Sequence, residues 1–567
     1  MLADRKLGGL LYGLKLALGA AIGYEIFVYL GPAYELAGSV IISAIIVSGL
    51  LNLLTMFSYC ELAGIVPKEG GEYTYARTAF GDIVGFTTGC IRWLSSVIGG
   101  ALAAGTFTLI FLELALPSFY QFGVQLPTEI VYPLIAVAII WSLGRSSIRG
   151  SKRLGLLILG SVLIFFAIYA LSGFWYLQRE PTAPPQVLPT FSGMPRFLLA
   201  IAFVLQLFIG MRATVARVPQ MKDPEKNAPR TFILATLVLL IVYCAVVYVG
   251  VTVVPPNGFF LKAAADKIFP LVNGIPMAGV IIAVIGMIVC LSGISSALMV
   301  QSSILSGMSR DGFLPKIVSS TSQSGTHRLA IIISSLSMVM FSVVPTMAAY
   351  LAVAAVLLNI MVFMIVNLSV ISLRIKKPHR YRPFKAPFYP FSPISGIVVS
   401  LGLFASVLWI KETSFIDIPI FGGLMGMVFL SYYLRKIGLN RLKVATGGIT
   451  LGFGGFTILL SYLIHASSEW PFGTLVPRPF TVFALAFAGV LSIIAGILNV
   501  NTRMRKNWLS HPSPSRKHLS HLTIVTGILI CLLSPLSLLI SSELLSIVIL
   551  GIVGPSNLIF GVLLLEK

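Results

Sequence analysis

The chain has 567 residues, of which 57% are hydrophobic and 10% are charged, and its formal net charge is +21. Soluble globular domains carry about 25% charged residues, so this composition excludes a soluble globular protein and indicates long segments that face lipid or one another. A net charge of this size would suggest a nucleic-acid partner for a soluble protein, but here the basic residues follow the apolar segments.

Sixteen apolar segments are predicted to span a membrane. With the N-terminus inside, the inside segments, taken with Lys15, the adjoining span ends and the C-terminus, hold 32 of the 40 Lys and Arg residues, and the outside segments hold 6. This asymmetry follows the positive-inside rule and predicts a multi-pass protein of the cell membrane with a cytoplasmic N-terminus, lipid contacts and no nucleic-acid partner. Only two serines separate the last two segments, so fifteen spans are the alternative. The segments cover about residues 7–36, 39–63, 83–116, 128–143, 153–177, 197–218, 231–254, 276–309, 329–345, 347–373, 394–410, 416–434, 444–465, 479–500, 521–540 and 543–564.

The first predicted span is interrupted at its centre by two glycines and a carboxylate. A charged residue at mid-bilayer costs about 2.5–3.5 kcal/mol, and irregular backbone at that depth must be surrounded by protein or by a cavity. The sixth span has a second interruption, with a glycine and an arginine. Broken spans in matching positions are typical of secondary transporters. The interruptions read Gly19-Ala20-Ala21-Ile22-Gly23-Tyr24-Glu25 and Gln206-Leu207-Phe208-Ile209-Gly210-Met211-Arg212.

A series of motifs links these interruptions to a known family. The first interruption, with Ile26-Phe27, is similar to Gly-x-x-Ile-Gly-x-Gly-Ile-Phe. Further motifs follow in family order: Glu61-Leu62-Ala63, Pro67-Lys68-Glu69-Gly70-Gly71-Glu72-Tyr73, Asp223-Pro224, Ser309-Arg310-Asp311-Gly312-Phe313-Leu314-Pro315, and Leu373-Arg374 with Arg382-Pro383-Phe384-Lys385. On these residues the chain resembles the amino acid–polyamine–organocation transporters, over roughly Leu7 to Trp409.

The resemblance implies an all-α membrane protein with a ten-helix core of the leucine-transporter type. In that fold two five-helix repeats are inverted, and helices 1 and 6 are broken. The resemblance assigns residues 1–390 to the core and residues 391–436 to two additional helices, and residues 437–567 are predicted to form an appended four-helix membrane module. It also implies uptake or exchange of amino acids or related amines by alternating access.

The two interruptions are predicted to surround the substrate. A broken helix exposes N–H groups, which suit a carboxylate, and C=O groups, which suit an ammonium, so a zwitterionic amino acid can meet both. The alternative is that these glycines only allow helices to pack closely. The predicted substrate-binding residues are Gly19, Ala20, Ala21, Ile22, Gly23, Tyr24, Glu25, Gln206, Phe208, Ile209, Gly210 and Arg212.

Glu25 and Arg212 depart from the family pattern, which has a glycine at the first position and a glutamate at the second. One hypothesis is that they face each other across the cavity and lower each other's cost of burial. A second is that Glu25 recognises a cationic group of the substrate and Arg212 an anionic one. A third is that Glu25 lies close enough to the outer surface to be solvated. Arg92, which also lies within a predicted span, is expected to extend toward the cytoplasmic face.

No cofactor is expected, and the coupling ion is open between H⁺ and Na⁺. The hydroxyl groups of Ser292, Ser295 and Ser296 form a candidate sodium site, although serines in membrane helices also hydrogen-bond between helices. Proton coupling through Glu25 and substrate exchange are the alternatives.

An intramembrane enzyme would need a metal or acid/base cluster inside the spans. All six histidines lie in connections or at span ends, and no paired Asp/Glu motif lies in a span interior, so an enzyme is not expected. The predicted function is an amino acid permease with a small-molecule substrate. A polyamine or organic-amine transporter and a non-transporting amino acid sensor are the alternatives, and the oligomeric state is left open.

Overall fold

The computed structural model describes residues 9–66, 70–121, 128–147, 154–179, 193–215, 221–254, 268, 277–314, 316–321, 327–342 and 348–409. The chain separates into two compact units, Met1–Ile410 and Lys411–Lys567, and the described residues all belong to the first. The predicted spans after residue 410, and with them the appended module, lie outside the described residues.

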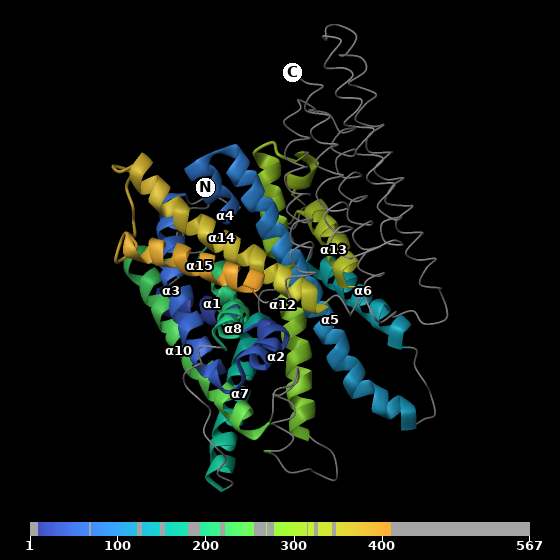
Figure 1. Ribbon diagram of the computed structural model, residues 1–567. Coiled ribbons are helices and arrows are strands. Elements are labelled where there is room, and N and C mark those ends of the chain that lie inside the picture. The colour runs from blue at the N-terminus through green and yellow to red at the C-terminus, as the bar shows by residue number, and fades with distance from the viewer. Residues whose placement is uncertain are drawn as a thin grey trace, which may run out of the picture. The chain divides into compact units, whose positions relative to one another are not determined.

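The described residues form helices and no strands, and every predicted span between residues 7 and 410 coincides with one or more helices. Figure 1 shows these helices packed side by side. Their bounds are α1 (Leu10–Ala21), α2 (Glu25–Ala37), α3 (Ile41–Ile65), α4 (Glu72–Phe80), α5 (Asp82–Gln121), α6 (Thr128–Ser147), α7 (Leu154–Arg179), α8 (Met194–Leu205), α9 (Arg212–Val215), α10 (Pro224–Val253), α12 (Met277–Arg310), α13 (Arg328–Ser342), α14 (Ala348–Lys376) and α15 (Phe391–Trp409). Three short 3₁₀ segments are η1 (Gly38–Val40), η3 (Gln206–Met211) and η5 (Lys316–Ser319).

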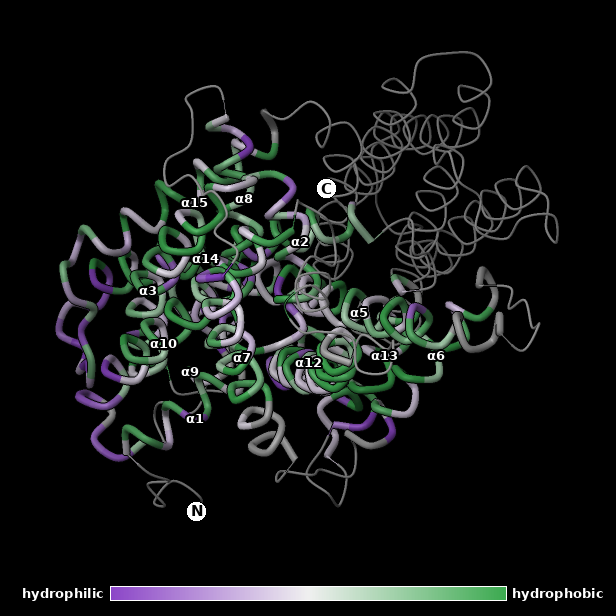
Figure 2. Tube along the Cα trace, turned by 90° about the horizontal axis from the view of Figure 1, so that it is seen from below, coloured by the Kyte–Doolittle hydropathy of each residue, from purple (hydrophilic) through white to green (hydrophobic). Residues whose placement is uncertain are grey.

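The outer surfaces of these helices are apolar. Within the described residues, seven helical stretches are long and apolar enough to cross a membrane, and four shorter apolar helices accompany them. Leu134, Ile164, Leu171 and Ile241 are each exposed by 63% to 71%. Figure 2 shows hydrophobic residues along the helices and hydrophilic stretches mainly in connections and at helix ends. This is the distribution expected of a bundle with lipid as its solvent, whereas the inverted two-repeat arrangement stays a prediction.

The first span is broken where the sequence predicts it. Helix α1 ends at Ala21 because Ile22 leaves the helical region, with φ −82° and ψ 86°, and α2 begins at Glu25. The three residues between the two helices include Gly23, whose N–H donates to the carbonyl of Ala21 at 3.0 Å. The interruption is therefore a short local break inside the predicted segment.

The sixth span is interrupted in a different way. Helix α8 continues directly into the 3₁₀ segment η3 at Gln206 and then into α9 at Arg212. The chain at this point is wound more tightly than an α-helix, where the sequence had predicted unwound backbone. A stretch of 3₁₀ helix inside a longer helix often marks a hinge or a functional site.

Helix α5 is central to the packing: it contacts α12, α14 and α4, while α8 packs against α2, α3 and α15. Two glycines let the break in the first span approach this centre closely. Tyr24 lies between Gly99 of α5 and Gly293 of α12, and a methyl group at either glycine would collide with its side chain. Small residues are used in this way in membrane bundles, because they let large neighbours and backbones come close.

Candidate functional site

The break in the first span and the 3₁₀ segment of the sixth span line one cavity. Helices α5, α12 and α14 supply the rest of the wall. The lining residues are Gly19, Ile22, Gly23, Tyr24, Glu25, Tyr29, Arg92, Ser95, Ser96, Gly99, Gln206, Ile209, Gly210, Arg212, Ser292, Gly293, Ser296, Ala297, Val300 and Asn359.

Most of the predicted site residues therefore lie around one space. Three described members of the set are not among these lining residues. Ala21 accepts a hydrogen bond from the Tyr243 hydroxyl through its carbonyl, at 3.1 Å, and Phe208 packs edge-to-face on the same tyrosine. Ser295 donates to the Leu291 carbonyl of its own helix at 3.1 Å, unlike Ser292 and Ser296, which line the cavity. Ala20 belongs to α1, and its side chain lies outside the described residues.

Glu25 is the first residue of α2 and is buried, with 8% of its surface exposed. Its Oε2 lies against Gly23, where any Cβ would strike it, and among the described residues it has no hydrogen-bond partner. The hypothesis that Glu25 is solvated at the outer surface is therefore wrong. A buried carboxylate oxygen without a partner is costly, and this one borders the cavity.

Arg212 is also buried, at 5% exposure, and two of its three nitrogens are used within the protein. Nη2 donates to Oδ1 of Asn359 at 3.0 Å, and Nε donates to the carbonyl of Ile209 at 3.3 Å. Asn359 in turn donates through Nδ2 to Oε1 of Gln206 at 2.9 Å. Nη1 has no hydrogen-bond partner among the described residues.

The carboxylate paired with Arg212 is Glu72. Its Oε1 is 3.8 Å from Nη1 of Arg212, and within the described ranges no ion pair joins Arg212 to Glu25. The two residues line the same cavity without a direct ion pair, and the hypothesis that they lower each other's cost of burial across it stays a prediction. Glu72 was missed because it stands after two glycines in an apparent loop, where a charged residue is normally solvated. Its neighbours in space come from other spans, and nothing in the local sequence indicates them.

Glu72 is held in place by a glycine turn. Gly70 and Gly71 have φ of +107° and +53°, values that favour glycine, and the turn starts α4 at Glu72. The Glu72 side chain is 10% exposed, and its Oε1 accepts hydrogen bonds from the Tyr59 hydroxyl at 3.1 Å and from Nε of Arg92 at 3.2 Å. Burial alone would raise the pKa of Glu72, but the two guanidinium groups lower it below its ordinary value. Glu72 is therefore a charged carboxylate between two arginines.

Arg92 belongs to this cluster and lines the cavity. Its side chain is 11% exposed and reaches Glu72 at the start of α4, and its extension toward the cytoplasmic face stays a prediction. Besides Glu72, it contacts Ser95 one turn along α5, with Nη1 3.4 Å from Oγ. We call Arg92, Glu72 and Arg212 the arginine–glutamate bridge.

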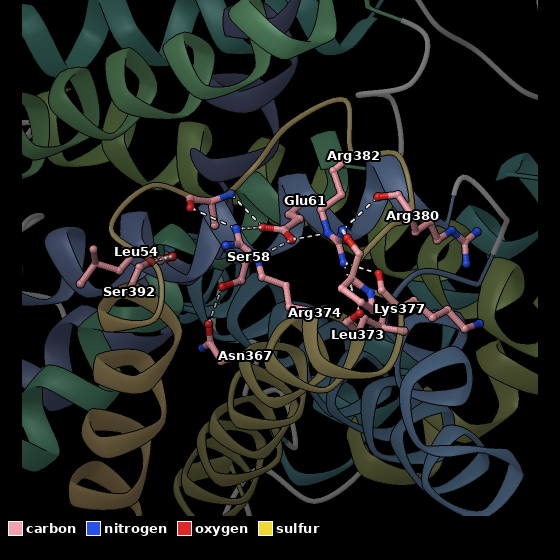
Figure 3. A network of polar contacts seen from close by, with 12 residues as sticks. Leu54, Ser58, Glu61, Asn367, Leu373, Arg374, Lys377, Arg380, Arg382 and Ser392 are labelled. Carbon is pink, nitrogen blue, oxygen red and sulfur yellow. Dashed lines mark hydrogen bonds and ion pairs between the residues drawn. The ribbon is translucent and has the colours of Figure 1, made fainter.

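A third buried carboxylate, Glu61 at the end of α3, is not among the residues that line the cavity. It accepts hydrogen bonds from Nε and Nη2 of Arg374, at 2.9 and 2.6 Å, and from the N–H of Ala386 at 2.8 Å. Arg382 completes the cluster at 3.2 Å. Figure 3 shows Glu61 between the two arginines, close to the loop that follows α14. The motif residues of this region thus join α3 to α14 and to the chain leading into α15.

Four of the five cysteines of the chain lie in the described residues. Cys60 and Cys290 are buried, Cys90 and Cys244 are partly buried, and all four are free. Cys531 lies outside the described residues.

Comparison with known proteins places this architecture in a family. A family profile described as "Amino acid permease" matches residues 14–430. The branched-chain amino acid permease BcaP of Lactococcus lactis subsp. cremoris (strain MG1363) is 25% identical over 425 residues, covering 69% of this chain and 87% of the relative. The methylthioribose transporter of Bacillus subtilis (strain 168) is 26% identical over 454 residues, covering 75% and 93%.

A third relative is the human large neutral amino acids transporter small subunit 2, which is 25% identical over 397 residues, covering 66% of this chain and 71% of the relative. All three are named as permeases or transporters, so the expectation that the chain is not an enzyme is confirmed. The predicted resemblance is confirmed as well, because the matching profile covers most of the sequence. The chain belongs to the amino acid permease family.

Proposed function

We propose that the chain is a secondary active transporter that moves an amino acid across the cell membrane by alternating access. The observation that carries this proposal is that the break at Ile22–Tyr24 and the 3₁₀ segment η3 line the same cavity. Interrupted helices leave backbone groups that can bind a polar solute at mid-membrane, and glycines let that solute approach.

The relatives support an amino acid as the cargo. Two of the three named above are an amino acid permease and an amino acid transporter subunit, whereas the third is named for methylthioribose. The cavity carries both charges that an amino acid needs to meet, a carboxylate at Glu25 and a guanidinium at Arg212.

The orientation follows from charge. The excess of Lys and Arg in alternate connections assigns the N-terminus to the cytoplasm. In this orientation α4, the end of α3 and the end of α14 lie on the cytoplasmic side.

A test is counterflow in liposomes that contain the purified full chain. We expect at least one labelled amino acid to enter vesicles preloaded with the same compound. The substitutions Glu25→Gln and Arg212→Gln should each abolish most of this uptake, whereas Glu225→Gln, an exposed change near the start of α10, should leave it intact. Replacing sodium by choline in the same experiment tests whether Na⁺ is the coupling ion. Uptake that does not change without sodium would exclude the sodium site at Ser292 and Ser296.

The alternatives give different results in the same experiment. Glu25, with its free oxygen, also suits an organic amine, and counterflow of amines but not of amino acids would support that cargo instead. Binding of an amino acid without any counterflow would contradict transport and indicate a sensor.

A further inference from the structure

The start of α2 already carries a carboxylate that belongs to the protein. The N-terminus of a helix attracts anions, because its free N–H groups and the helix dipole present positive charge. Here Glu25 occupies that position, with its carboxylate folded over Gly23. A substrate carboxylate would be repelled from this end of the break, whereas a substrate ammonium would be attracted to Oε2, which has no hydrogen-bond partner among the described residues.

The other end of the cavity offers the opposite charge. Nη1 of Arg212 is buried and lacks a hydrogen bond within the described part of the chain. Glu72 lies 3.8 Å away, beyond hydrogen-bonding distance, and shares its Oε1 with Arg92 and Tyr59. The arginine–glutamate bridge holds two guanidinium groups and one carboxylate, so it keeps one positive charge in excess. A carboxylate is the ligand that a guanidinium N–H binds most strongly.

The guanidinium is fixed in this position by its neighbours. Asn359 of α14 holds Nη2 of Arg212 and is itself oriented by its bond to Gln206 of η3. The ring of Phe363, one turn along α14, lies 5.1 Å from the guanidinium carbon. A group held on several sides can bind a ligand without losing much of its own freedom, so the side chain is ready for an anion at Nη1.

We propose that this cavity binds the two charges of an amino acid with side chains, the ammonium at Glu25 and the carboxylate at Arg212. Asn359 is a positioning residue for the guanidinium, and Glu72 is the counter-ion that it shares with Arg92. This inference rests on the proposed function, and it reverses the orientation expected from helix ends alone, in which the substrate carboxylate would bind the N–H groups at the start of α2. It selects cargo that carries both an amine and a carboxylate and disfavours polyamines.

Three probes that share the same isobutyl group test the assignment by competition against the transported amino acid. They are L-leucine, isoamylamine (which lacks the carboxylate) and 4-methylpentanoate (which lacks the amine). We expect Arg212→Gln to lower the affinity for L-leucine and 4-methylpentanoate by about tenfold or more. The affinity for isoamylamine should stay within about twofold of the wild-type value. Glu25→Gln should lower the affinity for L-leucine and isoamylamine and leave the affinity for 4-methylpentanoate unchanged. If counterflow identifies another amino acid, its own decarboxylated and deaminated analogues replace the leucine pair.

Glu61→Gln is the matched control, since Glu61 is a buried carboxylate between two arginines outside the cavity. It should lower thermal stability without changing the ratio of the three affinities. The assignment would be overturned if both variants lost equal affinity for the amine and the acid. It would also be overturned if Arg212→Gln weakened binding of the amine and Glu25→Gln weakened binding of the acid. Neither result would contradict transport itself. Absence of binding and counterflow for every amino acid would instead contradict the proposed function.

Discussion

Nη2 of Arg212 and Oδ1 of Asn359 lie 3.0 Å apart and join the sixth span to α14 across the wall of the cavity. Asn359 also donates to Gln206, so one amide side chain connects the first residue of η3 to the first residue of α9. The arginine that borders the cavity is thus oriented by a residue on another helix, and the predictions below use this dependence.

Replacing Asn359 by alanine should lower the affinity for the transported amino acid by about tenfold, because Arg212 loses a charge-assisted hydrogen bond that is worth about 1.5–3 kcal/mol. Uptake kinetics measure this as an increase in KM. The control is Asn367→Ala on the same helix, where the amide interacts with Ser58 and Thr55 outside the cavity. That variant should be less stable with an unchanged KM, and an equal effect on KM would contradict the role of Asn359.

Replacing Glu72 by glutamine should have two effects of opposite sign. The fold loses the shared counter-ion of Arg92 and Arg212, so the free energy of unfolding should fall by about 3–5 kcal/mol. The cavity gains a positive charge, so 4-methylpentanoate should bind more tightly than to the wild type. Thermal unfolding and competition binding measure these changes, and Glu72→Asp should restore part of the stability. Weaker binding of the acid would show that Glu72 does not compete with an anion at Arg212.

The contribution of Glu72 to stability should depend on pH in one direction. Its pKa in the folded protein is below the ordinary value of 4.5, so the charged form stabilises the fold above that value, and this stabilisation is lost as the pH falls through the folded-state pKa. The difference in unfolding temperature between wild type and Glu72→Gln should be constant from about pH 8 to pH 5 and then shrink. A difference that shrinks already near neutral pH would contradict the lowered pKa.

Replacing Gly293 by alanine should impair both folding and transport, because the new methyl group would strike the ring of Tyr24 at the break. Overpacking of this kind typically costs about 1–3 kcal/mol. Gly402→Ala on α15 is the matched control, since nothing lies within 4 Å of the position that its Cβ would take. The unfolding temperature and the initial rate of uptake should both fall in the first variant only.

Replacing Glu61 by glutamine should destabilise the protein by about 3–5 kcal/mol, since it leaves Arg374 and Arg382 without their shared carboxylate. Thermal unfolding of the purified full chain measures this effect. Glu225→Gln, which removes an exposed partner of Tyr381, should change stability by less than about 1 kcal/mol. An unfolding temperature of Glu61→Gln equal to that of the wild type would show that the cluster at the end of α3 contributes little.

Hydropathy predicted the positions of the described spans because a bilayer requires about twenty apolar residues per helix and satisfied backbone throughout. The break in the first span was predictable for the same reason: two glycines and Glu25 are too costly for an unbroken helix in lipid. The winding of η3 was not predictable, since Gln206–Met211 can satisfy its hydrogen bonds either as 3₁₀ or as α-helix, and packing decides between them.

The ion pairs were the least predictable part. Glu72, Arg92 and Arg212 come from three different elements, and no local pattern tells which carboxylate meets which guanidinium. The sequence identified Arg212 as unusual, and one of its hypotheses set it opposite Glu25, the carboxylate at the break in the first span. Asn359 gave no signal of its own, because a single amide in an apolar helix is equally compatible with helix packing.

The tight winding of η3 has a geometric consequence. Six residues rise about 12 Å as a 3₁₀ helix and about 9 Å as an α-helix, and they turn by about 120° more in the tighter form. Relaxing Gln206–Met211 to ordinary winding would therefore draw Arg212 about 3 Å along the helix axis and swing it by a third of a circle. A change from 3₁₀ to α-helical winding in six residues can therefore move the Arg212 guanidinium away from a bound anion without bending the helix.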